Sequence, residues 1–161
     1  MPSNESLAIR LLSSFFVALS NFMANLSIDS EKAVVAASPD TIYTFLSDMN
    51  NFKELMPSSV SQWESTKEHC TFKIPGMGTI GLKLVSHDEQ HIRLSSYGPV
   101  MFPFELVVNM HPEGSGKTIT FMTFNADVNP MMKMMIEKPI GNFFSYLTRS
   151  LQKKFDPPAT A

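Results

Sequence analysis

The chain has 161 residues, a length typical of one domain and sufficient to bury a core without disulfides or a structural metal. Thirteen Lys and Arg residues against 15 Asp and Glu residues give a net charge of −2, so no basic excess exists for binding nucleic acid or anionic membranes. A single cysteine, Cys70, excludes an internal disulfide and a zinc site built from several cysteines. Methionine (12) and phenylalanine (13) are abundant, whereas charged residues make up only 17%.

Residues 7–26 are the one candidate for a targeting or membrane segment. Arg10, Asn21 and Asn25 interrupt it, which argues against a spanning helix, and it has neither a positive leader region nor a clear cleavage site. We therefore expect a cytoplasmic protein without an integral membrane span. Apolar residues recur at helical spacing: Leu12, Phe15, Phe16, Leu19, Phe22, Met23 and Leu26.

This spacing predicts an accessory amphipathic helix within residues 1–27. We expect it to pack on the domain or on a second copy, which makes a homodimer one alternative. Association with a membrane surface is a further alternative, although the polar face lacks the Lys and Arg that interfacial helices favour. Met23 is a second candidate start of the chain.

From residue 28 onward the pattern predicts strands and helices in a definite order. Residues 29–36 are predicted to form a strand, and Ser38-Pro39-Asp40 then supplies a cap, a first-turn proline and an acid that start a helix. A short second helix is predicted over 52–56. Alternating apolar residues and turn signals then predict six strands: 59–66, 69–75, 79–87, 91–97, 102–111 and 117–128.

The last predicted element is a long helix from Pro130 to about Phe155, with an apolar face and a kink at Pro139 and Gly141. Residues 157–161 are expected to be a disordered tail. The predicted class is α+β: a curved six- or seven-stranded antiparallel sheet around the long helix, forming one domain over 28–156. Such a sheet encloses more space than one row of side chains fills, which predicts a ligand cavity between sheet and helix.

The opening strand, the segment SPDTIYTFLSDMNNFKELMP, the strand series and the segment NPMMKMMIEKPIGNFFSYLTRSLQKKF resemble the SRPBCC superfamily. This superfamily has the helix-grip fold of START-like lipid-transfer domains and polyketide cyclases/dehydratases, and the best fit is to small bacterial members of uncharacterised function. The resemblance covers about residues 28–155. It implies a cavity that holds a lipid, sterol, quinone or polyketide, and it carries over no catalytic residue, because the superfamily has no universal catalytic motif.

Two glycine-rich stretches match nucleotide-binding motifs only superficially. Gly76-Met77-Gly78-Thr79-Ile80-Gly81 fits G-x-G-x-x-G, but the residues that follow alternate like a strand instead of opening a helix. Gly116-Lys117-Thr118 resembles the tail of a P-loop between two strands. We interpret both as hairpin turns. No pattern indicates a metal site or a cofactor, and Cys70 is interpreted as a small buried residue.

Nine residues are predicted to line the cavity, because each lies where sheet and long helix should face each other or at the cavity mouth: Trp63, Phe72, Tyr97, Phe104, Phe121, Met132, Met135, Ile136 and Phe143. For any one of them alone we favour solid core, whereas methionines beside aromatic residues, taken as a set, favour an adaptable lining for an apolar ligand. Lys83, Arg93, Glu105 and Asp127 alternate with apolar neighbours and are expected to point to solvent. The sequence thus favours binding of a small apolar ligand, with a cyclase- or dehydratase-like enzyme and an interaction module as alternatives.

Overall fold

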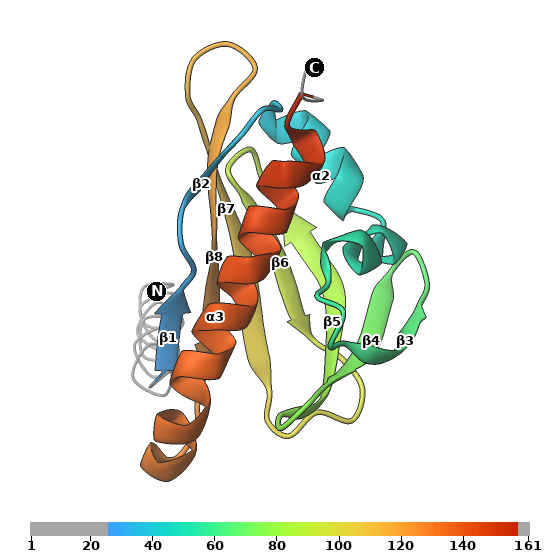
Figure 1. The fold of residues 1–161 in the computed structure, drawn as a ribbon, viewed down its shortest axis with the longest axis vertical. Coiled ribbons are helices and arrows are strands. Elements are labelled where there is room, and N and C mark those ends of the chain that lie inside the picture. Colours follow the sequence, from blue (N-terminus) through green and yellow to red (C-terminus); the bar gives the residue numbers. More distant parts are fainter. Residues whose placement is uncertain (1–25, 158–161) are drawn as a thin grey trace, which may run out of the picture.

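The structure is a computed structural model that describes residues 26–157. The predicted accessory helix and all of the tail beyond Pro157 lie outside these residues, except that Leu26 and Ser27 belong to the first strand. The described chain forms one curved sheet with a long helix lying across its inner face (Figure 1). Its elements are β1 (Leu26–Asp29), β2 (Ala33–Val35), α2 (Pro39–Leu46), η1 (Met49–Leu55), β3 (Ser61–Ser65), β4 (His69–Ile74), β5 (Gly78–His87), β6 (His91–Ser96), β7 (Phe104–Pro112), β8 (Thr118–Ala126) and α3 (Pro130–Phe155).

The sheet is antiparallel throughout, in the order β1-β8-β7-β6-β5-β4-β3, with β2 also paired to β8. The predicted first strand, 29–36, is in fact two short strands on the same neighbour. Ser30 interrupts it, because its hydroxyl accepts a hydrogen bond from the Met122 amide and also bonds the Thr148 hydroxyl of α3. The interruption fastens this edge of the sheet to the helix and raises the strand count to eight.

Two short helical elements close one end of the inner face. The Ser38 hydroxyl accepts a hydrogen bond from the Thr41 amide and so caps α2, which begins at Pro39. The second predicted helix is a 3₁₀ helix, η1, which starts earlier than predicted because Asp48 caps the Asn50 amide. Met49, Phe52 and Leu55 of η1 are fully buried, and η1 contacts α3, β3 and β4.

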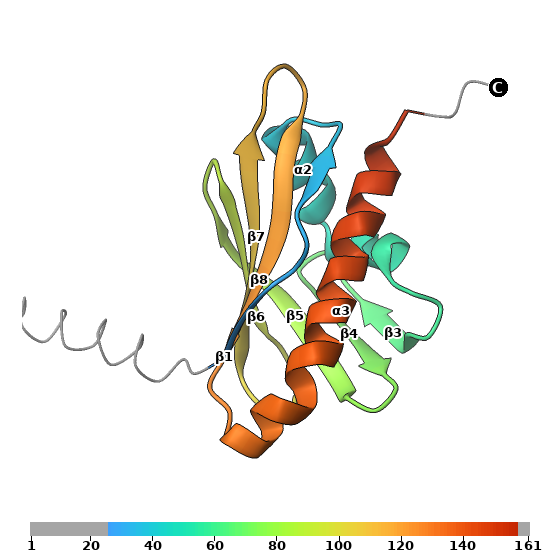
Figure 2. The ribbon, with the colours of Figure 1, turned by 60° about the vertical axis from the view of Figure 1, so that its left-hand side comes forward.

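The long helix α3 starts where the sequence predicts, with the Asn129 side chain capping the Met132 amide. It continues through Pro139 without a break, and its axis changes direction along its length (Figure 2). The helix backbone lies nearest β1, β2, β8 and η1. The remaining inner face, toward β4 to β6, is therefore reached by large side chains instead of by the helix backbone.

A continuous row of aromatic rings fills the middle of this inner face. Trp63 stacks on Phe72 with ring centroids 5.5 Å apart, and Phe72 lies 5.9 Å from Phe143 of α3. The row continues through Phe144 at 5.3 Å and on to the sheet residue Phe124 at 5.6 Å. Phe104 then stacks on Phe124 at 4.9 Å. The centre of the grip is thus solid core and not an open cavity.

Two of the predicted lining residues, Tyr97 and Phe121, lie on the outer face of the sheet. Tyr97 stacks on His69 at 4.1 Å, and Phe121 stacks near His111 and lies under the Lys32 ammonium, all away from α3. Phe121 was predicted on the wrong face because β8 has apolar residues in both phases of its in–out alternation. Ile119 and Phe121 belong to one phase, and Met122 and Phe124 belong to the other. A regularly paired strand turns only one phase inward, and the buried one is Met122, Phe124 and Ala126.

The other outer-face predictions are confirmed. Arg93 and Glu105 form an exposed ion pair at 3.2 Å, and Lys83 is exposed. The hairpin interpretation of the glycine-rich stretch is confirmed as well, because Gly76 and Gly78 adopt positive φ angles between β4 and β5. Asp127 is exposed just before α3.

A substitution at Gly81 tests how closely β5 approaches the end of β6. A Cβ atom at this position would lie 1.8 Å from the Tyr97 carbonyl oxygen, a backbone atom with little room to move. We expect Gly81→Ala to lower the free energy of unfolding by about 3 kcal/mol, the upper end of the usual cost of overpacking. Urea titration followed by circular dichroism measures the change.

Gly141→Ala is the matched control. Its Cβ would meet only the Ile28 side chain, at 3.4 Å, and it lies inside α3. Because alanine favours a helix over glycine, this variant should gain up to about 1 kcal/mol. Equal stability of Gly81→Ala and the unmodified protein would contradict the close approach.

Candidate functional site

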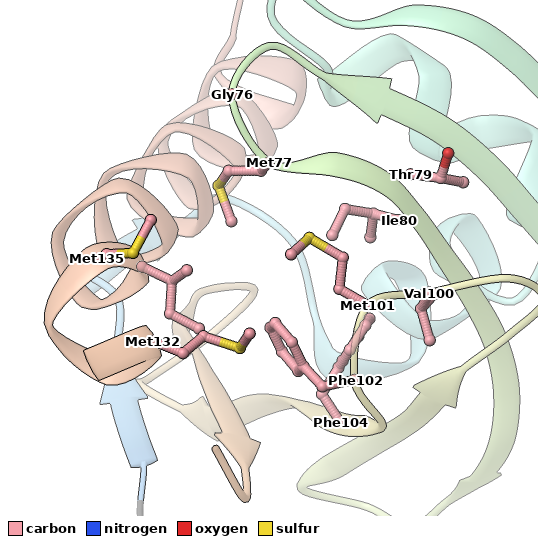
Figure 3. A pocket seen from close by; sticks show the side chains of 11 residues that line it. Gly76, Met77, Thr79, Ile80, Val100, Met101, Phe102, Phe104, Met132 and Met135 are labelled. Carbon is pink, nitrogen blue, oxygen red and sulfur yellow. The ribbon is translucent and has the colours of Figure 1, made fainter. Parts of the chain in front are cut away.

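The candidate site is an apolar pocket at the end of the grip where α3 begins. It has a volume of about 80 Å³ and lies between the first turns of α3, the β4–β5 turn and the loop that joins β6 to β7 (Figure 3). α2 and η1 close the opposite end of the inner face, so within residues 26–157 no helical element other than α3 covers this one. Eleven residues line it: Gly76, Met77, Thr79, Ile80, Val100, Met101, Phe102, Phe104, Met132, Met135 and Ile136.

Methionine supplies four of the eleven lining residues, more than any other residue type. Met77, Met101 and Met132 approach the space from three different segments, and Met135 lies at its edge on α3 (Figure 3). Methionine has three rotatable bonds and a polarisable thioether, so such a wall adjusts its shape to an apolar guest. Phe102 and Phe104 form the inner side and join the pocket to the aromatic row through Phe124.

The lining offers little polar chemistry. Thr79 is its single residue with a polar side chain, and none of the eleven residues carries a titratable group. General acid–base catalysis requires such a group within hydrogen-bonding reach of the reacting atoms. The arrangement can therefore exclude water and hold an apolar molecule, with one hydroxyl and backbone groups available for hydrogen bonding.

The nine predicted residues lie in three different parts of the structure: the pocket, the aromatic row and the outer face of the sheet. Phe104, Met132, Met135 and Ile136 line the pocket. Trp63, Phe72 and Phe143 belong to the aromatic row, where they fill the interior beside it. Tyr97 and Phe121 lie on the outer face.

The residues that sequence reasoning missed come mainly from turns. Met77 lies between two glycines, and Val100, Met101 and Phe102 follow Gly98-Pro99. Turn residues are usually polar, so a run of large apolar side chains in a turn is itself a signal of a pocket or an interface. Met101 is 63% exposed, in agreement with that signal.

Other candidate chemistry lies elsewhere and is accounted for locally. His87 stacks on Tyr43 at 3.8 Å, and His91 bonds the Asp88 carboxylate at 3.0 Å in the β5–β6 turn. The hydrogen bond from the Gln90 amide is the main cause that lowers the pKa of the Asp88 carboxyl below its usual value. His91 lowers it further. Within residues 26–157, no three His, Cys, Asp or Glu side chains gather closely enough to hold a metal ion.

Comparison with known proteins decides the family. The model of the family described as polyketide cyclase / dehydrase and lipid transport matches residues 29–156, which is most of the chain. The chain belongs to this family. The match begins at the end of β1 and ends just after α3, so it spans the sheet, the helix and the pocket between them. The resemblance seen in the sequence is thereby confirmed.

Solved structures show the same fold at low sequence identity. A START superfamily protein from Mycobacterium smegmatis is 17% identical with a TM-score of 0.63, covering 80% of this chain and 96% of its own. Truncated norcoclaurine synthase from Thalictrum flavum is 17% identical with a TM-score of 0.64, covering 80% and 92%. A conserved protein from Geobacillus kaustophilus is 14% identical with a TM-score of 0.61, covering 81% and 95%.

Among functionally curated proteins, none matches this sequence. The described part of the chain contains no helix with the length and apolar character that a membrane span requires. The helix-grip class predicted from the sequence is confirmed by the family and by these neighbours.

Cys70 provides a prediction about reactivity. It is fully buried on the inner face of β4, and burial raises the pKa of its thiol from 9.0 to about 12, although a backbone hydrogen bond from Leu82 acts in the opposite direction. The thiolate is the reactive form, so the native protein should not react with iodoacetamide at pH 8, whereas the protein unfolded in urea should react fully. Intact-mass spectrometry distinguishes the two.

The same shift makes stability depend on pH. The unfolded chain loses the thiol proton near pH 9, before the folded protein does, so this contribution to stability is complete below pH 9 and is lost as the pH rises to about 12. A Cys70→Ala variant should lack this alkaline component. Rapid alkylation of the native protein at pH 8 would contradict the burial.

Proposed function

We propose that this protein binds a small apolar molecule, such as a lipid, quinone or polyketide fragment, in the methionine-lined pocket. The observation that carries the proposal is the lining itself: flexible and aromatic apolar side chains from three segments around an open space. Membership of the polyketide cyclase / dehydrase and lipid transport family supports a domain that binds hydrophobic ligands. The apolar area that a ligand buries there provides the driving force.

The size of the pocket limits how the ligand binds. A volume of about 80 Å³ is well below the roughly 300–1,000 Å³ of sites that enclose a drug-sized molecule. A larger ligand must therefore displace methionine side chains, since the aromatic row blocks the path deeper into the core. We propose that Met77, Met101 and Met132 move apart on binding while Phe72, Phe124 and Phe143 stay in place.

Binding is favoured over catalysis by the chemistry of the wall. A cyclase- or dehydratase-like reaction needs a group that transfers protons, and the eleven lining residues include none. The norcoclaurine synthase structures are enzymes of the same fold, one of them in complex with dopamine and hydroxybenzaldehyde. At 16–17% identity this likeness supports the fold and does not assign their reaction to this chain.

A fluorescent apolar probe, N-phenyl-1-naphthylamine, tests the proposal. The unmodified protein should raise its fluorescence in a saturable manner. Met132→Gln places an amide in the pocket wall, and burying an unpaired amide costs about 1–3 kcal/mol, so the Kd should rise about 5- to 160-fold. Circular dichroism checks that the variant is folded.

Val85→Gln is the control for this experiment. Val85 is 60% exposed on β5, the strand that also carries Thr79 and Ile80, but it does not line the pocket. Its Kd should stay within about twofold of the unmodified protein, since a change on the outside removes no contact with the probe. Equal weakening in both variants, or none in Met132→Gln, would place the probe elsewhere and refute the proposal.

A further inference from the structure

The methionines at the pocket mouth differ sharply in exposure from those in the core. Met101, on the loop between β6 and β7, and Met135, on α3, are 63% and 69% exposed, and both line the pocket (Figure 3). Met77 and Met132 also line it and are half-buried. Three core methionines are at most 1% exposed: Met49, Met110 and Met122. Solvent therefore reaches sulfur atoms at the pocket mouth and not those of the core.

A solvent-exposed thioether reacts with peroxides. Hydrogen peroxide transfers one oxygen atom to the sulfur: the O–O bond breaks, an S–O bond forms, the sulfur is oxidised by two electrons and the peroxide is reduced to water. The product, methionine sulfoxide, is polar, and sulfoxide reductases convert it back to the thioether. The Cys70 thiol does not compete for the oxidant, because it is buried and burial raises its pKa to about 12, which keeps it in the unreactive protonated form.

A sulfoxide in the pocket wall weakens the binding of an apolar ligand. Thr79 is the single lining residue with a polar side chain, so the contacts that the wall offers are almost entirely apolar. A sulfoxide oxygen that points inward lies unpaired against the ligand, and one that turns out to water removes its side chain from the wall. The aromatic row, which fills the core beside the pocket, contains no methionine and is unaffected. Oxidation at the mouth therefore lowers affinity without unfolding the domain.

We propose that Met101 and Met135 form a reversible oxidation site that controls whether the pocket holds its apolar ligand. The thioether form of the two residues binds the ligand, and the sulfoxide form releases it. The oxidant is a peroxide. The reverse step takes two electrons from a dithiol: its two thiols form a disulfide, the S–O bond breaks and the oxygen leaves as water. This inference rests on the proposed function, because it concerns the same pocket.

Two other methionines of α3 provide an internal control. Met131 and Met134 are 74% and 83% exposed in the same first turns of the helix, so peroxide reaches them at least as readily. Neither of them lines the pocket. The proposal therefore predicts that the position of the oxidised sulfur, and not the extent of oxidation, determines the loss of affinity.

Titration with N-phenyl-1-naphthylamine before and after peroxide treatment tests the proposal. The peroxide dose is set by peptide mass spectrometry so that Met101 and Met135 are oxidised while the half-buried Met77 and Met132 stay reduced. The Kd for the probe should then rise at least about fivefold, which corresponds to about 1 kcal/mol for one sulfoxide in the wall. Reductases for both sulfoxide epimers, with dithiothreitol as the electron donor, should restore the original Kd. Circular dichroism should show an unchanged fold throughout.

Leucine variants separate the pocket mouth from the rest of the helix, because leucine is apolar and carries no sulfur. Met101→Leu with Met135→Leu should show the same Kd, within about twofold, before and after peroxide. Met131→Leu with Met134→Leu should lose affinity on treatment as the unmodified protein does. Each variant is compared with its own untreated form, so a difference in starting affinity does not affect the result.

The possible outcomes distinguish this inference from the proposed function. If the untreated protein shows no saturable binding of the probe, both are refuted. If it binds the probe and the Kd is unchanged once Met101 and Met135 are oxidised, the oxidation site alone is overturned. An equal response to peroxide in the two leucine variants overturns it as well, and so does a loss of binding that is accompanied by unfolding.

Discussion

One helix has to cover the inner face of a sheet that is seven strand positions wide. Six spacings of about 4.8 Å give a width of roughly 29 Å, whereas a helix with its side chains is about 10 Å across. Curvature reduces the difference but does not remove it. The structure closes the remaining gap in two ways: α2 and η1 cover one end, and the aromatic row from Trp63 to Phe104 fills the middle. Within residues 26–157, no helix other than α3 covers the other end, and the pocket lies there.

This arrangement explains why methionine is concentrated at one end of the molecule. Toward the C-terminal end of α3, Leu147 and Leu151 are fully buried, and at the centre Phe143 and Phe144 pack against other rings. At the start of the helix, the described residues provide no such ring stack, and the sequence there is Met-Met-Lys-Met-Met. Side chains with many rotamers adapt to partial exposure, and to a pocket that is empty or filled, better than rings held in a fixed stack. The centre and C-terminal half of α3 are therefore rigidly packed, whereas its first turns form an adaptable wall.

The fold could be predicted from the sequence because each element has a local cause. Ser38-Pro39 and Asn129-Pro130 start the two α-helices where expected, and alternation places six strands within a few residues of their observed bounds. The first strand was predicted as one because the hydroxyl network of Ser30, Thr148 and the Met122 amide joins residues more than 90 positions apart. No local pattern contains that information.

The site was predicted less well than the fold, for related reasons. Which residues of α3 face the sheet follows from helical period, so Met132, Met135 and Ile136 were found. Which part of the interface is open depends on how far the rings of Phe72 and Phe143 reach across it, a property of packing that periodicity does not report. Phe121 shows the limit most clearly, because either phase of β8 supplies apolar residues and only pairing with β7 selects one.

The most direct test of this account is a ¹³C methyl spectrum of methionine-labelled protein during titration with decanoic acid. The methyl signals of Met77, Met101 and Met132 should shift on binding. Those of Met49, Met110 and Met122, which are buried away from the pocket, should remain in place. Shifts in Met110 and Met122 with no change in Met101 and Met132 would contradict binding in the methionine-lined pocket. They would place the ligand inside the core, where the aromatic row lies.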